Sequence, residues 1–206
     1  MPTGQTLAAS LPADTVKALD GYLAGQGGSV AALAQLKPSL VATQLAVARL
    51  TGLGYFAAFG LDQYYMARAE TRPILELERV EDQMALLTSP PMDVQADMVK
   101  ITLEQMDEIE AMVADMVVAW LSGDDVALRA LFDEQSPQTE AYQAFNRRLL
   151  DDRNVGMATT IQGYLATPGT YFVLVGAAHL AGPGSIVDVL QSRGVGGKRI
   201  YSDDTW

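Results

Sequence analysis

The chain has 206 residues, 49% of them apolar and 19% charged, and its 14 basic and 25 acidic side chains give a net charge of −11. This composition supports one folded domain and excludes intrinsic disorder, which combines low hydrophobicity with high charge. No cysteine is present, and His179 is the only histidine. These counts exclude disulfides, thiolate metal sites, cysteine nucleophiles and any site that takes two imidazoles from this sequence.

The acidic charge is concentrated in the middle of the chain. Between Glu76 and Glu140 there are 16 acidic and 3 basic residues, a balance of −13, while the rest of the chain sums to +2. Nucleic acids and anionic membranes are bound through clustered lysine and arginine, so we expect neither as a partner. Glycines and prolines interrupt the longest uncharged run, Asn154 to Val187, and no transmembrane segment is expected.

Helical spacing of apolar residues dominates the first part of the chain. Pro12-Ala13-Asp14 opens a predicted helix that ends at the glycines of residues 25–28. A short helix is expected over residues 30–36, and a third over residues 39–52. This third helix is apolar almost all round, so we expect it in the core. Another helix is expected to begin with Asp62 at its N-cap and to run to about Ala69.

The acidic middle predicts further helices and one short strand. Residues 73–78 alternate between apolar and polar side chains, which is typical of a strand, and residues 80–87 return to helical spacing. A single apolar stripe runs from Val94 to Trp120 and predicts one long helix with its acidic side chains facing solvent. A short helix is expected over residues 126–132, and one or two more helices over residues 141–165.

The end of the chain has a different pattern. Tyr171 to Val175 is a continuous apolar run, typical of a strand buried on both faces, and Lys198 to Tyr201 predicts another strand. Between them, Ser185 is placed to cap a helix. We therefore predict a βαβ crossover over about residues 170–202 and a single α/β domain over residues 1–206. Its small, mainly parallel sheet would carry a large helical insertion at about residues 10–166, and we expect the first strands of the sheet to be missing from the N-terminal side.

The candidate chemistry lies where the predicted strand at residues 171–175 ends. Gly176 allows the backbone to turn, and His179 follows in the region where ligands bind in parallel α/β folds. The turn at Gly182 and Gly184 leads into the helix capped by Ser185, and a helix N-terminus favours an anion. A buried histidine bonded to backbone groups is the alternative interpretation.

Charged partners for His179 come from other segments. Glu78 and Asp62 could join it in a metal site, or they could serve as a solvated strand edge and a helix cap. Arg153, next to Asn154, could clamp a carboxylate or bond to backbone carbonyls. A catalytic zinc site usually has three protein ligands, and nothing near His179 in the sequence supplies a second nitrogen.

The motifs around these residues resemble a known family. The segment Tyr171-Phe-Val-Leu-Val-Gly-Ala-Ala-His-Leu-Ala-Gly-Pro-Gly184 closely resembles the C-terminal signature of the TraB/GumN family, which includes the Tiki-type metalloproteases. Arg153-Asn154-x-x-Met157 resembles its arginine–asparagine motif. Gly60-Leu61-Asp62 and Leu75-Glu-Leu-Glu78 resemble its middle segment. The likeness covers nearly the whole chain.

The resemblance implies an α/β fold with a helical insertion, similar to haem-binding ChaN-like folds. It also implies a metal-dependent hydrolase or protease site built from two G-x-x-H motifs and an early glutamate. Gly176 and His179 match the second motif, so His179 is the implied metal ligand. The implied catalytic residues are His179, Arg153 and Asn154, and the implied motif or structural positions are Gly176, Gly182, Gly184, Asp62 and Glu78. We expect the first motif to lie before the start of this chain. We expect activity only in a protein that also carries that motif.

Several alternatives stay open on the sequence. The intact protein is expected to use a divalent metal, of undetermined identity, on a peptide or small-molecule substrate. The alternative is a non-catalytic protein that binds haem through His179 or assists polysaccharide export, as the GumN name implies. Bacterial relatives with export signals imply a periplasmic location, although this chain begins without such a signal. Exposed sheet edges would favour a homo-oligomer.

Overall fold

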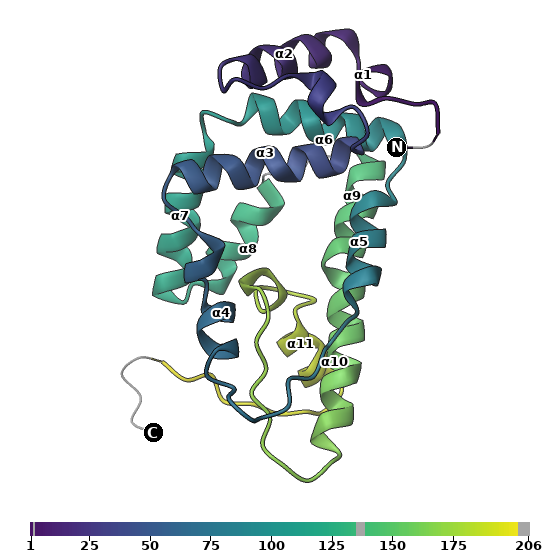
Figure 1. Cartoon of the computed structure of the whole chain (residues 1–206). Coiled ribbons are helices and arrows are strands. Elements are labelled where there is room, and N and C mark those ends of the chain that lie inside the picture. The colour runs from purple at the N-terminus through teal and green to yellow at the C-terminus, as the bar shows by residue number, and fades with distance from the viewer. Residues whose placement is uncertain (2, 135–138, 202–206) are drawn as a thin grey trace.

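The computed structural model describes residues 1, 3–134 and 139–201, and these residues form helices and connecting segments (Figure 1). The α-helices are α1 (Leu7–Ser10), α2 (Ala13–Ala24), α3 (Pro38–Gly52), α4 (Leu61–Met66), α5 (Val80–Thr88), α6 (Met92–Glu104), α7 (Ile109–Ser122), α8 (Asp125–Glu134), α9 (Glu140–Leu149), α10 (Asp151–Leu165) and α11 (Ile186–Ser192). Three short 3-10 helices are η1 (Val30–Leu33), η2 (Ala57–Phe59) and η3 (Ala177–His179).

The predicted α/β fold is wrong for this structure, because the described residues contain no strand and no sheet. Residues 73–78, 171–175 and 198–201 were expected as strands, and all three are irregular. The segment at residues 171–175 was expected to be buried on both faces, but Phe172 is 70% exposed. A strand is held by backbone bonds to a neighbouring strand, and an apolar run cannot supply that neighbour.

Most of the predicted helices are confirmed. The expected helices at the start of the chain correspond to α2, η1 and α3, and the expected helix over residues 80–87 corresponds to α5. The prediction of one long acidic helix is wrong in one respect, because a turn at residues 105–108 divides this segment into α6 and α7. Helix α4 also ends at Met66, before the expected Ala69, and Gly60 rather than Asp62 occupies its N-cap.

The larger core lies among α1, α2, α3 and α6. Leu7, Leu19, Val41 and Val99 are completely buried there, and α1 and α2 lie over the pair α3 and α6 at the top of Figure 1. Helix α3 is in the core as expected, although its outer face, including Val47, is exposed. No helix in the described part of the chain is both long and apolar enough to cross a bilayer.

A second, smaller core positions the candidate site. Met157, Ala158 and Ile161 of α10 pack against Ile186 of α11, and the partly buried Leu77 and Val175 complete this cluster. The packing of α10 on α11 brings the start of α10 next to the turn that precedes α11 (Figure 1). Two segments that are 30 residues apart therefore share one site.

Candidate functional site

His179 is buried at the end of η3, where its imidazole meets the first turns of α10. Its side chain and backbone together are only 7% exposed. Its Nδ1 lies 2.6 Å from Oδ1 of Asn154, a residue of α10 with no exposed surface. The Asn154 Nδ2 group donates to the carbonyl oxygen of Gly184 at 2.8 Å. One buried amide thus joins the histidine to the turn before α11.

These two bonds define which nitrogen carries the proton when the imidazole is neutral. Because Asn154 donates through Nδ2 to a carbonyl, its Oδ1 is the atom that accepts from His179. Nδ1 of His179 must then carry a proton, so Nε2 keeps its lone pair whenever the imidazole is neutral. A histidine held in this way by a hydrogen bond at one nitrogen can bind a metal or accept a proton at the other.

The electrostatic surroundings keep this imidazole neutral. Burial, and next the positive charge of Arg153, lower the pKa of His179 below its ordinary value, while the carboxylate of Glu78 opposes the shift. The hydrogen bonds from Arg153 also hold the pKa of Glu78 below its ordinary range. Near pH 7 the site therefore contains a neutral histidine beside an ionised pair.

Arg153 and Glu78 form a two-pronged ion pair. Arg153 Nε donates to Glu78 Oε2 at 2.9 Å, and Nη2 donates to Oε1 of the same carboxylate. The remaining Nη1 donates to the carbonyl of Leu149 at 2.8 Å. Arg153 is therefore occupied by a carboxylate of its own chain and by a backbone carbonyl. This geometry ties the irregular segment at residue 78 to α10.

The turn that precedes α11 is held from both sides. Gly182 has φ +69°, and a Cβ added there would lie 2.7 Å from Cγ of Arg129, so a side chain has no room. Gly184 has φ +75°, and its amide donates to Oδ2 of Asp188 at 2.8 Å. Ser185 caps α11 as predicted, by accepting from the amide of Asp188. The anion expected at this helix start is thus the chain's own Asp188.

Of the five predicted site residues that are not glycine, the structure brings four together and leaves one apart. His179, Asn154, Arg153 and Glu78 share the site, whereas Asp62 is exposed in the first turn of α4. Among the described residues, Asp62 has no hydrogen bond or ion pair with those four. Gly176 lies beside the imidazole, but a Cβ there would make only an ordinary contact of 3.8 Å with Cδ2 of His179.

Two residues of the site were not predicted from the sequence. Asp188 lies three residues after the capping Ser185, and this spacing resembles a capping box, so the sequence carried a usable signal. Arg129 of α8 donates to the carbonyl of Pro183 at 3.3 Å and lies 3.6 Å from a carboxylate oxygen of Asp151. No local pattern marks a contact between residues this far apart in sequence.

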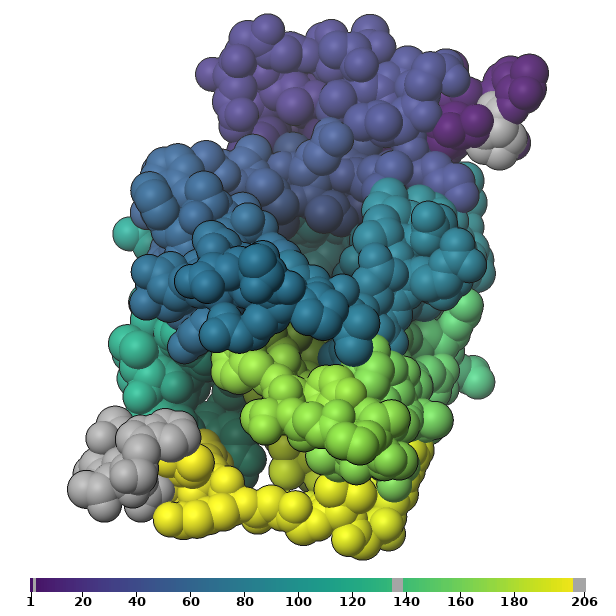
Figure 2. All heavy atoms as spheres, turned by 60° about the horizontal axis from the view of Figure 1, so that its bottom comes forward, coloured from purple at the N-terminus to yellow at the C-terminus, as the bar shows by residue number. Residues whose placement is uncertain are grey.

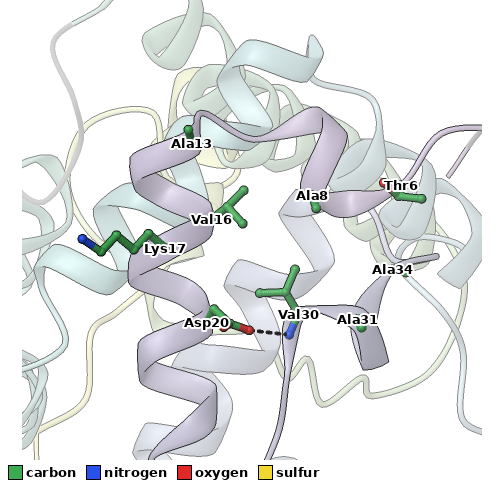
Figure 3. A pocket seen from close by; sticks show the side chains of 9 residues that line it. All are labelled: Thr6, Ala8, Ala13, Val16, Lys17, Asp20, Val30, Ala31 and Ala34. Carbon is green, nitrogen blue, oxygen red and sulfur yellow. Dashed lines mark hydrogen bonds between the residues drawn. The ribbon is translucent and has the colours of Figure 1, made fainter.

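A hollow of about 540 Å³ lies elsewhere, between α1, α2 and η1. Figure 3 shows small and aliphatic side chains around it, with Lys17 at its edge and Asp20 bonded to the backbone amide of Val30. None of the candidate site residues lines this hollow.

The comparisons with known proteins agree with the motifs. Residues 1–196 match the model of the TraB/PrgY/gumN family. The uncharacterized protein YbaP of Escherichia coli (strain K12) is 27% identical over 170 residues, which are 76% of this chain and 60% of YbaP. The protein of the same name from Shigella flexneri gives the same values. The chain thus spans about 60% of the length of these relatives. No solved structure matches the chain.

Proposed function

The chain belongs to the TraB/PrgY/gumN family, and from this membership and the state of His179 we propose that it forms part of a metal-dependent hydrolase. Its substrate would be a peptide or a small molecule. The observation that carries the proposal is the bond of 2.6 Å between Asn154 Oδ1 and His179 Nδ1. This bond leaves Nε2 as a free lone pair on a neutral imidazole, which is the form that binds a metal or accepts a proton.

In this proposal the residues around His179 are positioning residues. Asn154 holds the imidazole plane and tautomer, and Gly184 holds the amide of Asn154. Burial lowers the pKa of His179, and the nearby positive charge of Arg153, which is engaged with Glu78, lowers it further. Such fixed geometry matters because small misplacements of a reacting group cost large factors in rate.

The described residues alone do not fit a catalytic metal centre. His179 supplies one nitrogen ligand, and both carboxylate oxygens of Glu78 are taken by Arg153. Within the described ranges, no three histidine, aspartate or glutamate side chains gather into a metal-binding group. A catalytic zinc usually has three protein ligands. The proposal therefore requires ligands besides those that the described residues bring to His179.

Hydrolysis assays with added metals test the proposal. Fluorogenic peptides and simple esters would be incubated with Zn²⁺, Mn²⁺ or Co²⁺ and a longer form of the protein that also carries the first G-x-x-H motif of the family. We expect metal-stimulated hydrolysis that is abolished in His179→Ala and reduced at least about tenfold in Asn154→Ala, the range typical of positioning groups around a metal ligand. The control is Asp152→Asn, an exposed residue of α10 beside the site. Hydrolysis that persists unchanged in His179→Ala would contradict the assignment.

The non-catalytic alternatives have no specific support among the described residues. Haem would also use Nε2 of His179, so one measurement separates the two functions. An intense haem absorption band that appears on addition of haemin and is lost in His179→Ala would favour haem binding over hydrolysis.

A further inference from the structure

Helix α8 packs against the segment that carries His179. Leu128 of α8 and Ala181 belong to one buried cluster, and the partly buried Ala177 packs against it. These two alanines flank the histidine in the sequence. Figure 1 shows the yellow-green segment of η3 between α8 and α10. The histidine segment is therefore held by α8 as well as by α10.

Arg129 of α8 links this helix to the turn that precedes α11. Its Nη1 donates to the carbonyl oxygen of Pro183 at 3.3 Å, and its Nε donates to the two carboxylate oxygens of Asp133 at 3.0 and 3.1 Å. A Cβ added at Gly182 would lie 2.9 Å from Cβ and 2.7 Å from Cγ of Arg129. Arg129 thus meets the turn with both its stem and its guanidinium, while Asp133 holds the guanidinium from within α8.

The same guanidinium lies next to a carboxylate at the start of α10. Nη1 of Arg129 is 3.6 Å from Oδ1 of Asp151, a buried oxygen that accepts no hydrogen bond from the described residues. A Cβ added at Gly184 would lie 3.7 Å from this oxygen, so the carboxylate lies beside the turn. A buried carboxylate oxygen without a hydrogen bond needs a nearby positive charge. Arg129 supplies that charge and favours the close approach of α10 to the turn.

Helix α8 is itself fixed in place. Nη1 of Arg199 donates at 2.7 Å to Oδ1 of Asp125, the first residue of α8. In Figure 2 the yellow end of the chain lies beside the teal-green atoms around residue 120. The buried Leu128 holds the middle of the helix. Arg129 therefore projects from a helix that is anchored at its start and at its middle.

We propose that Arg129 is a positioning residue, which keeps the proton of the neutral His179 on Nδ1 by holding the turn. Arg129 holds the carbonyl of Pro183, and the adjacent carbonyl of Gly184 accepts from Nδ2 of Asn154. If the turn shifts, this second bond is lost and the amide of Asn154 is free to rotate. Its Nδ2 can then donate to Nδ1 of His179, which selects the tautomer with the proton on Nε2. The inference deepens the proposed function and rests on it only for the effect on hydrolysis.

Nitrogen NMR of the imidazole tests the inference without any hydrolysis. Arg129→Met keeps an unbranched stem against Gly182 and removes the guanidinium. We expect the nitrogen shifts of His179 to move from those of the Nδ1-protonated tautomer toward those of a mixture. Arg129→Lys keeps one charged donor but not the fork, so we expect a smaller change in the same direction. Far-UV circular dichroism checks the fold of each variant, and Arg129→Lys decides the question if Arg129→Met does not fold.

The matched control is Arg49→Met in α3. Nε of Arg49 also donates to a backbone carbonyl, that of Met106, at 3.3 Å, and its Nη2 lies 3.8 Å from a carboxylate oxygen of Glu110. These contacts join α3 to α7 and to the turn before it, so the His179 shifts are expected to match those of the wild type. Wild-type shifts in the folded Arg129 variants would overturn the inference. An equal change in Arg49→Met would also overturn it, because the tautomer would then respond to any loosening of the fold.

Hydrolysis gives a second measurement, which separates this inference from the proposed function. In the longer form of the protein that carries the first G-x-x-H motif, we expect Arg129→Met to lower kcat about tenfold with KM unchanged. This is the low end of the range for groups that support a metal ligand. A wild type without hydrolysis would refute the proposed function and leave the nitrogen shifts to decide the role of Arg129. An unchanged kcat in Arg129→Met, with hydrolysis abolished in His179→Ala, would refute the positioning role alone.

Discussion

The replacement Asn154→Ala tests the structural basis of the candidate site. Asn154 is completely buried and makes two side-chain hydrogen bonds, one with His179 and one to Gly184. Its truncation leaves the Nδ1–H group of His179 without an acceptor, and a buried donor in that state costs about 1–3 kcal/mol. The carbonyl of Gly184 is only partly buried and recovers some hydration. We expect the free energy of unfolding to fall by about 2–4 kcal/mol in total.

Urea denaturation measures this loss, and NMR measures its effect on the imidazole. Because His179 is the only histidine, the two imidazole nitrogen signals of a ¹⁵N-labelled chain belong to one residue. In the wild type we expect the tautomer with the proton on Nδ1. In Asn154→Ala that tautomer is no longer selected, and we expect nitrogen shifts typical of a mixture of both tautomers.

A second buried amide provides the control. Gln95 of α6 is 2% exposed, accepts from Ser39 Oγ at 2.9 Å and donates to the carbonyl of Pro90 at 2.8 Å. Gln95→Ala should therefore cost a similar free energy but leave the His179 signals unchanged. A wild-type imidazole protonated on Nε2, or identical nitrogen shifts in the wild type and Asn154→Ala, would refute the tautomer assignment.

Three further predictions concern pH, the ion pair and the glycine turn. The folded-state pKa of His179 is lower than its ordinary 6.5, so the unfolded chain takes up this proton first and stability should begin to fall as the pH drops below about 6.5. The pKa of Glu78 is likewise below its ordinary 4.5, so the stability that this carboxylate contributes should be lost as the pH falls below about 4.5. Urea titrations at several pH values measure both losses of stability. His179→Gln should remove the loss that begins near pH 6.5. Glu78→Gln should lower the free energy of unfolding by about 1–3 kcal/mol, because it leaves Arg153 without its carboxylate partner in a partly buried site. An unchanged urea midpoint would contradict a stabilising role of this ion pair. Gly182→Ala should cost about 2–4 kcal/mol, because its Cβ would collide with Arg129, whereas Gly184→Ala should cost only the left-handed strain of about 1–2 kcal/mol; equal thermal shifts for the two would argue against the close approach.

The helices could be predicted because their signals are local. Apolar spacing, Pro38 at the start of α3 and the Ser185 cap all lie within the elements that they define. The strands could not be predicted in the same way. The run at residues 171–175 is apolar enough for a buried strand, but a strand also needs a neighbour, and the described residues provide none. The break between α6 and α7 was missed because the apolar stripe continues across the turn.

The same distinction between local signals and long-range contacts applies to the candidate site. The sequence by itself determined which residues to consider, since His179, Arg153, Asn154 and Glu78 stand in recognisable motifs. It also determined the family to which the chain belongs. Only the tertiary structure decided that Asn154 sets the tautomer of His179, that Glu78 occupies Arg153, and that Asp62 lies apart. Each of these outcomes depends on contacts between segments 25 or more residues apart. Sequence periodicity reports the environment of a residue within its own element, whereas such contacts are decided by how the elements pack.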